Sequence, residues 1–220
     1  MRSLLAVLLT LLAPLAAHAE LYGAIGWARV TSDRPAFNRA DLVNLGETPT
    51  GNSSNADAIP LALGYRFVKW FAIEASYLDA KELQRANYSA RAAADQLSRG
   101  TYTREWGYRA IGLSAVGSLF FTERWAAVLK GSANHVTAEY RSRALVTRTD
   151  LVPSQTPVND STSHKSTEWI PSVALGVAYV GKPIGARLMF ERFADKSGLY
   201  GQGNDLNGVK SIALQATFSF

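Results

Sequence analysis

The end of the chain alternates without interruption between apolar side chains and small or polar ones. From Ser211 onward, the apolar set is Ile212, Leu214, Ala216, Phe218 and Phe220. The intervening set is Ser211, Ala213, Gln215, Thr217 and Ser219. Successive side chains of a β-strand point to opposite faces of a sheet, so this segment predicts a strand with one apolar and one polar face. Strands of a transmembrane barrel have this pattern, because one face contacts lipid and the other lines the lumen.

The start of the chain has the order of features found in a secretory signal peptide. Arg2 precedes an apolar run from Leu4 to Leu15, and Ala17 and Ala19 then provide small residues for a cleavage site before Glu20. The apolar run is too short to cross a bilayer as a helix, which takes about 20 residues. We therefore expect residues 1–19 to be a cleaved signal peptide and residues 20–220 to form the exported domain.

The exported part contains no cysteine, which excludes disulfides and thiolate metal sites. Its longest uncharged stretches, residues 111–122 and 170–181, are too short for transmembrane helices. Strands of about 9–11 residues are long enough to cross lipid when they close into a barrel, because closure pairs every backbone group.

Eight segments of the exported part show the alternation expected of such strands. They are residues 21–31, 59–68, 71–77, 108–120 and 169–179, the segments that begin at Trp125 and Ile184, and the C-terminal segment. Short turns near residues 69, 122 and 182 alternate with long polar segments at about 32–57, 80–107, 141–167 and 196–208. This asymmetry predicts an all-β, eight-stranded, antiparallel up-and-down transmembrane barrel with four long external loops and short periplasmic turns. We expect the inward face to consist of Gly, Ala, Ser and charged residues, with the larger residues on the opposite face. A soluble barrel would instead place its large apolar side chains inside.

Two further features concern the ends of the strands and the second loop. Trp70, Trp125, Trp169 and Tyr179 lie near predicted strand ends, as expected for aromatic side chains at a membrane–water interface. The alanine-rich stretch from Ala86 to Leu97 predicts a short helix in the second long loop.

Two short segments resemble the small OmpA-like outer-membrane barrels. Residues 63–77, LGYRFVKWFAIEASY, are similar to the second hairpin of that family, and residues 187–193, RLMFERF, are similar to its seventh strand. The resemblance implies localisation in the outer membrane of a Gram-negative cell and recognition of the Phe220 strand by the barrel-assembly machinery. The sequence contains no segment like the peptidoglycan-binding domain of full-length members, so we expect a stand-alone barrel without direct attachment to the cell wall.

Five charged residues fall on the predicted lumen face: Arg66, Glu74, Lys130, Arg187 and Glu191. The family resemblance implies that the last four meet in the lumen. Charges in a narrow lumen are costly unless they are paired, and an eight-stranded barrel is just wide enough for side chains to fill it. Two interpretations follow: a polar network that seals the lumen, or a gated path for ions or small solutes that opens when the pairs exchange.

The long loops carry the remaining candidates. Arg141 and Arg143 lie just beyond the fifth strand, where they could pair with phosphates of lipopolysaccharide. The same loops are candidates for binding a host or surface ligand. The sequence pI of about 9.5 does not indicate nucleic-acid binding, because the charges are scattered and the chain is exported.

Catalysis on lipid A is the weakest of the functional alternatives. His135 shares a strand face with Glu139 but not with Ser132, and Thr137 is the nearest hydroxyl on its own face. We therefore assign no catalytic residue, and we expect no metal and no cofactor. The preferred prediction is a monomeric outer-membrane barrel with a structural or surface-interaction role, in contact with lipids and lipopolysaccharide. A narrow pore and a lipid A-modifying enzyme remain the alternatives.

Overall fold

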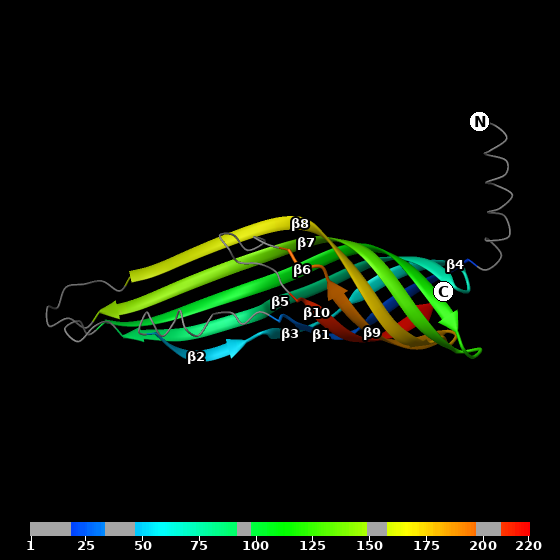
Figure 1. Ribbon diagram of the computed structural model, residues 1–220, viewed down its shortest axis with the longest axis horizontal. Coiled ribbons are helices and arrows are strands. Elements are labelled where there is room, and N and C mark those ends of the chain that lie inside the picture. The colour runs from blue at the N-terminus through cyan, green and yellow to red at the C-terminus, as the bar shows by residue number, and fades with distance from the viewer. Residues whose placement is uncertain (1–18, 34–46, 92–97, 149–157, 197–207) are drawn as a thin grey trace, which may run out of the picture.

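The computed structural model describes residues 19–33, 47–91, 98–148, 158–196 and 208–220. Eight strands form a closed antiparallel barrel (Figure 1), which confirms the predicted fold class. They are β1 (Glu20–Thr31), β4 (Leu61–Val68), β5 (Phe71–Arg91), β6 (Ser98–Phe120), β7 (Trp125–Arg148), β8 (Val158–Tyr179), β9 (Ile184–Phe193) and β10 (Lys210–Ser219). β10 pairs with β1 from Tyr22↔Ser219 to Thr31↔Lys210, so the cylinder has no open edge along these residues. The expected signal peptide lies outside the described residues except for Ala19.

The second strand of the barrel is built from three pieces. β4 pairs with both β1 and β5, whereas the preceding β3 (Asn55–Ala58) pairs with β1 alone and β2 (Glu47–Ser53) pairs with β5 alone. Ile59 and Pro60 separate β3 from β4. Proline has no backbone N–H to donate to a ladder, which fits an interruption at this point.

The outward face carries a continuous belt of exposed apolar side chains. On β8, for example, Val173, Leu175 and Val177 are exposed, while the alternating Ser172, Ala174 and other small residues point into the lumen. At the end of the barrel with the short turns, Trp70, Phe121 and Trp125 are exposed. So much exposed apolar surface is unusual for a protein in water, whereas a lipid-facing barrel requires it.

The strands β5, β6, β7 and β8 are much longer than the barrel wall. They continue together beyond the ends of β1, β9 and β10 and form a projecting sheet at the outer end of the barrel (Figure 1). Much of the segments 80–107 and 141–167 is therefore strand, as are residues 47–53 and 55–57 of the segment 32–57, although we expected all three segments to be loops. The same applies to Ala86–Arg91, where we expected a helix; residues 92–97 lie outside the described ranges. These segments are rich in Thr, Tyr and Arg. Such residues can form strands and cross-strand side-chain pairs even where apolar and polar residues do not alternate. No helix within the described ranges is long and apolar enough to cross a membrane.

Candidate functional site in the barrel lumen

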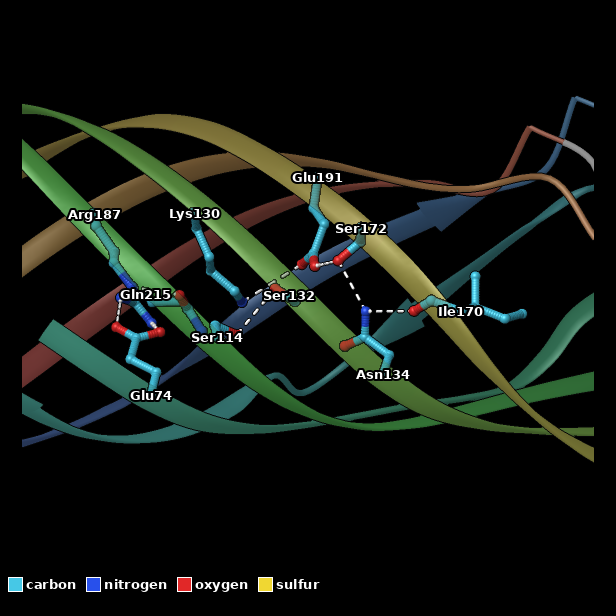
Figure 2. Close-up of polar contacts among 10 residues, drawn as sticks. All are labelled: Glu74, Ser114, Lys130, Ser132, Asn134, Ile170, Ser172, Arg187, Glu191 and Gln215. Carbon is cyan, nitrogen blue, oxygen red and sulfur yellow. Dashed lines mark hydrogen bonds and ion pairs between the residues drawn. The ribbon is translucent and has the colours of Figure 1, made fainter.

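A buried ion pair crosses the centre of the lumen. Glu74 of β5 and Arg187 of β9 point toward each other (Figure 2), with side chains 0% and 6% exposed. Two guanidinium nitrogens of Arg187 donate to the two carboxylate oxygens of Glu74, and Nη2 and Oε2 are 3.3 Å apart. The Tyr22 hydroxyl also donates to Glu74 at 2.6 Å, and Arg187 Nε donates to Gln215 at 2.7 Å. Both charges are thus paired and hydrogen-bonded, as burial in a lumen requires.

A second polar cluster lies beside this pair. Lys130 Nζ of β7 is 3.7 Å from a Glu191 oxygen of β9, and the Ser172 hydroxyl of β8 donates to Glu191 at 2.5 Å. Asn134 Nδ2 donates to Ser172 Oγ at 2.9 Å and to the Ile170 carbonyl at 3.1 Å (Figure 2). The cluster therefore links three strands through side chains in addition to their backbone ladders.

The structure brings together four of the five predicted lumen charges, in two neighbouring pairs. The fifth, Arg66, lies near the end of the barrel with the short turns, where it donates to Glu20 at 2.6 Å. Its guanidinium also lies over the Tyr22 ring, 5.0 Å from the centroid. Glu20 accepts a second cation, because Lys182 Nζ is 3.0 Å away. These contacts tie β1, β4 and the turn before β9 together at this end.

A layer of large apolar side chains fills the lumen on the outer side of the polar clusters. This upper apolar layer consists of Leu83, Trp106, Tyr108, Val136, Ile170 and Phe193, all almost fully buried. The Tyr108 and Phe193 rings meet edge to face with centroids 5.3 Å apart. We expected the inward face to be small or charged throughout, and at this level that expectation is wrong. Leu83 and Trp106 lie in segments that the sequence pattern assigned to a loop.

Several members of the lumen network were not among the predicted site residues, chiefly Tyr22, Asn134, Ser172 and Gln215. Their inward direction was readable from alternation, since each falls on the same face as its small or polar neighbours along the strand. Their pairing was not readable, because it joins strands that are far apart in sequence. Arg187 and Glu74, for example, are separated by 113 positions.

The outer-face candidates lie on the projecting part of β7. Arg141 is exposed and its Nη2 is 2.7 Å from Glu139 Oε1. Arg143 is exposed further along the strand.

His135 points outward, with its ring centroid 5.2 Å from that of Trp169, whereas Ser132 is buried in the lumen. His135 and Ser132 therefore lie on opposite faces of the wall. Among the described residues, no group of three or more His, Asp or Glu side chains is placed to hold a metal ion.

Gly64 of β4 makes room for the tyrosine of the central network. It faces Tyr22 across the β1–β4 ladder, and an added Cβ would overlap the Tyr22 ring. We expect Gly64→Ala to displace this ring from Glu74 and to lower the free energy of unfolding by about 1–3 kcal/mol. Gly131→Ala is the control, because nothing lies within 4 Å of a Cβ there. Denaturant unfolding in lipid vesicles measures both, and equal stability of the two variants would contradict the prediction.

The closed barrel, its lipid-facing belt and its filled lumen define a transmembrane β-barrel with the strand number of the small OmpA-like proteins that the sequence resembles. No protein-family model and no curated protein matches the chain. Among solved structures, it is similar to Neisserial surface protein A (NspA) at 14% identity, covering 92% of this chain and 97% of that one, with a TM-score of 0.45. It is also similar to Ail, the attachment invasion locus protein of Yersinia pestis, solved with the heparin analogue sucrose octasulfate. That likeness has 16% identity, coverage of 92% and 99%, and a TM-score of 0.44.

Proposed function

We propose that this protein is a monomeric outer-membrane barrel whose wall serves as a closed anchor and whose projecting sheet serves surface interactions. A cleaved signal peptide would direct its export, and the barrel-assembly machinery would insert it by recognising the strand that ends at Phe220. The observation that carries the proposal is the double closure of the lumen, by the polar network and by the upper apolar layer. In this reading the exposed sheet formed by β5–β8, including Arg141 and Arg143, is the part that meets lipopolysaccharide or an external ligand.

The closure has a clear physical basis. Two cavities of about 40 Å³ lie in the lumen, and Arg187 lines both of them. The interior of an eight-stranded barrel is only wide enough to be filled by its own side chains. An ion that passed the Glu74–Arg187 and Lys130–Glu191 pairs would then meet the rings of Tyr108 and Phe193. These apolar rings offer no replacement for its hydration shell. Rearrangement of the ion pairs alone would therefore not open a path.

Single-channel recording in planar bilayers tests this proposal. We expect no stepwise openings from the wild-type protein, from Glu74→Gln or from Lys130→Met, because the upper apolar layer is intact in all three. Protease digestion of the projecting sheet, in vesicles prepared in the same way, checks that each protein is inserted and in which orientation. Discrete openings of the wild-type protein, or openings that appear with either charge substitution, would favour the gated pore instead.

A further inference from the structure

The second barrel strand leaves a gap in the wall at the outer end. The β4–β5 ladder ends at Leu61↔Tyr77, and the β2–β5 ladder begins at Ser53↔Arg85. Between these points, the described residues 54–60 and 78–84 form no ladder with each other, although β3 remains paired with β1. A groove of about 760 Å³ lies on the outer face along this gap. Its volume is within the range of about 300–1,000 Å³ that is typical of ligand sites.

The groove crosses the border of the lipid-facing belt. Its lower part is lined by Trp27, Ile59, Leu61 and Tyr77, and its upper part by Asn55, Asp57, Asp79 and Lys81. On each contributing strand, the outward side chains change from apolar to polar at the same level, with Trp27 followed by Arg29 on β1 and Tyr77 followed by Asp79 on β5. The lower part therefore lies among acyl chains and the upper part among headgroups. An amphiphile is the class of molecule that matches both parts.

A polar hollow adjoins the groove on the other side of β5. It has a volume of about 370 Å³ and shares Asp79 and Lys81 with the groove. Gly107 of β6 leaves this hollow without a central side chain, and β5 bulges opposite it between Ala80 and Gln84. The other charged residues around it are Glu105, Arg109, Glu139, Arg141 and Lys165. The two hollows adjoin along β5, where Asp79 and Lys81 line both of them. We call this pair of hollows the depression; its groove is apolar at the lower end and its polar hollow is highly charged.

The charges of the polar hollow favour an anionic headgroup. Arg109 is 3.4 Å from Asp79, and Arg141 is 2.7 Å from Glu139, so two of the four cations are already paired. Lys81 and Lys165 form no ion pair with any described residue. Two unpaired ammonium groups suit phosphate oxygens. The surrounding carboxylates suit the hydroxyl groups of a sugar, since an ionised carboxylate only accepts hydrogen bonds.

From this arrangement we propose that the depression binds one phosphorylated glycolipid of the outer leaflet. One acyl chain lies in the groove between β3 and β5, against Trp27 and Ile59. The phosphate contacts Lys81 and Lys165, and sugar hydroxyls donate to Asp79 and Glu139. The inference rests on the proposed outer-membrane location and deepens it, since it assigns the lipid contact to the β3–β5 gap and to Lys81 and Lys165 in addition to Arg141 and Arg143.

Native mass spectrometry of the full chain in detergent micelles tests the phosphate contact. The probe is diphosphorylated lipid A, and its dephosphorylated form is the comparison. We expect Lys81→Gln/Lys165→Gln to weaken binding of the phosphorylated probe at least about tenfold, because two charge-assisted contacts are lost. The matched control is Lys196→Gln/Lys210→Gln, which removes the same charge near the outer end of β9 and β10, and it is expected to bind as the wild type does. Equal loss in both double variants, or equal binding of both probes by the wild type, would overturn the phosphate assignment.

A second pair of variants tests the acyl-chain contact. Ile59 and Val173 are almost equally exposed, at 63% and 62%, but only Ile59 lies in the groove. We expect Ile59→Ala to weaken lipid A binding about fivefold, because apolar contact is lost, while Val173→Ala leaves it unchanged. Equal binding by the two variants would overturn the groove assignment. The conductance experiment does not involve Ile59, Lys81 or Lys165. Loss of the lipid-site proposal would therefore leave the proposal of a closed lumen standing, and the reverse also holds.

Discussion

Replacement of Glu74 by Gln is expected to lower the free energy of unfolding by about 3–5 kcal/mol. Gln keeps the shape of the side chain but leaves the Arg187 guanidinium, which is 6% exposed, without the carboxylate that contacts it directly. The loss of one partner of a buried pair is costly because the other charge remains desolvated. Denaturant titration in phosphatidylcholine vesicles, with the folded fraction read from unboiled gel migration, measures the change.

Asp79→Asn is the control for this prediction. Asp79 is paired with Arg109 at 3.4 Å on the outer face, where the side chains are 18% and 51% exposed. Pairs that are open to water contribute about 0–1 kcal/mol, so this variant is expected to remain close to the wild type. The further change of Arg187 to Met in the Glu74→Gln background is expected to recover part of the loss, since it removes the unpaired charge. A loss for Glu74→Gln no larger than for Asp79→Asn would show that the ion pair does not stabilise the barrel.

Phe193→Ala is expected to destabilise the protein by about 3–5 kcal/mol through the upper apolar layer. Phe193 is 2% exposed and packs edge to face against Tyr108. Truncation leaves a cavity where β9 meets the long strands, and the rigid wall limits collapse around it. The same vesicle titration measures the effect. Phe193→Leu retains most of the volume and is expected to cost less than about 1.5 kcal/mol, so similar losses in the two variants would contradict a packing role.

Alternation was sufficient to predict the barrel because lipid contact imposes a strict chemical difference between the two faces of each strand. The signal disappears beyond the membrane, where both faces of the sheet meet water. Thr101 and Thr103 of β6 pair with Leu145 and Arg143 of β7, yet no apolar period marks these segments as strands. Their sequence therefore indicated loops, and the projecting sheet and the outer half of the lumen filling were missed together.

The candidate site was predictable in its residues but only partly in its contacts. Alternation placed Glu74, Lys130, Arg187 and Glu191 on the inward face. Which charges meet depends on the stagger of the strands around the barrel, and that stagger follows from ladders between distant segments. Arg66 illustrates the limit, because it also lies on the inward face but is close enough to the end of its strand to pair with Glu20 instead.

Closure of the wall by β1 and β10 has a consequence for the order of assembly. The ladders from β4 to β10 join consecutive strands and can form one hairpin after another as the chain becomes available. The β1–β10 seam instead joins segments at opposite ends of the described chain, so its loop-closure entropy is the largest of all the ladders. Until that seam forms, β1 and β10 both present unpaired backbone edges, a state prone to aggregation in water. We therefore expect the β1–β10 seam to form last, and a chaperone that covers the two unpaired edges to matter most before it forms.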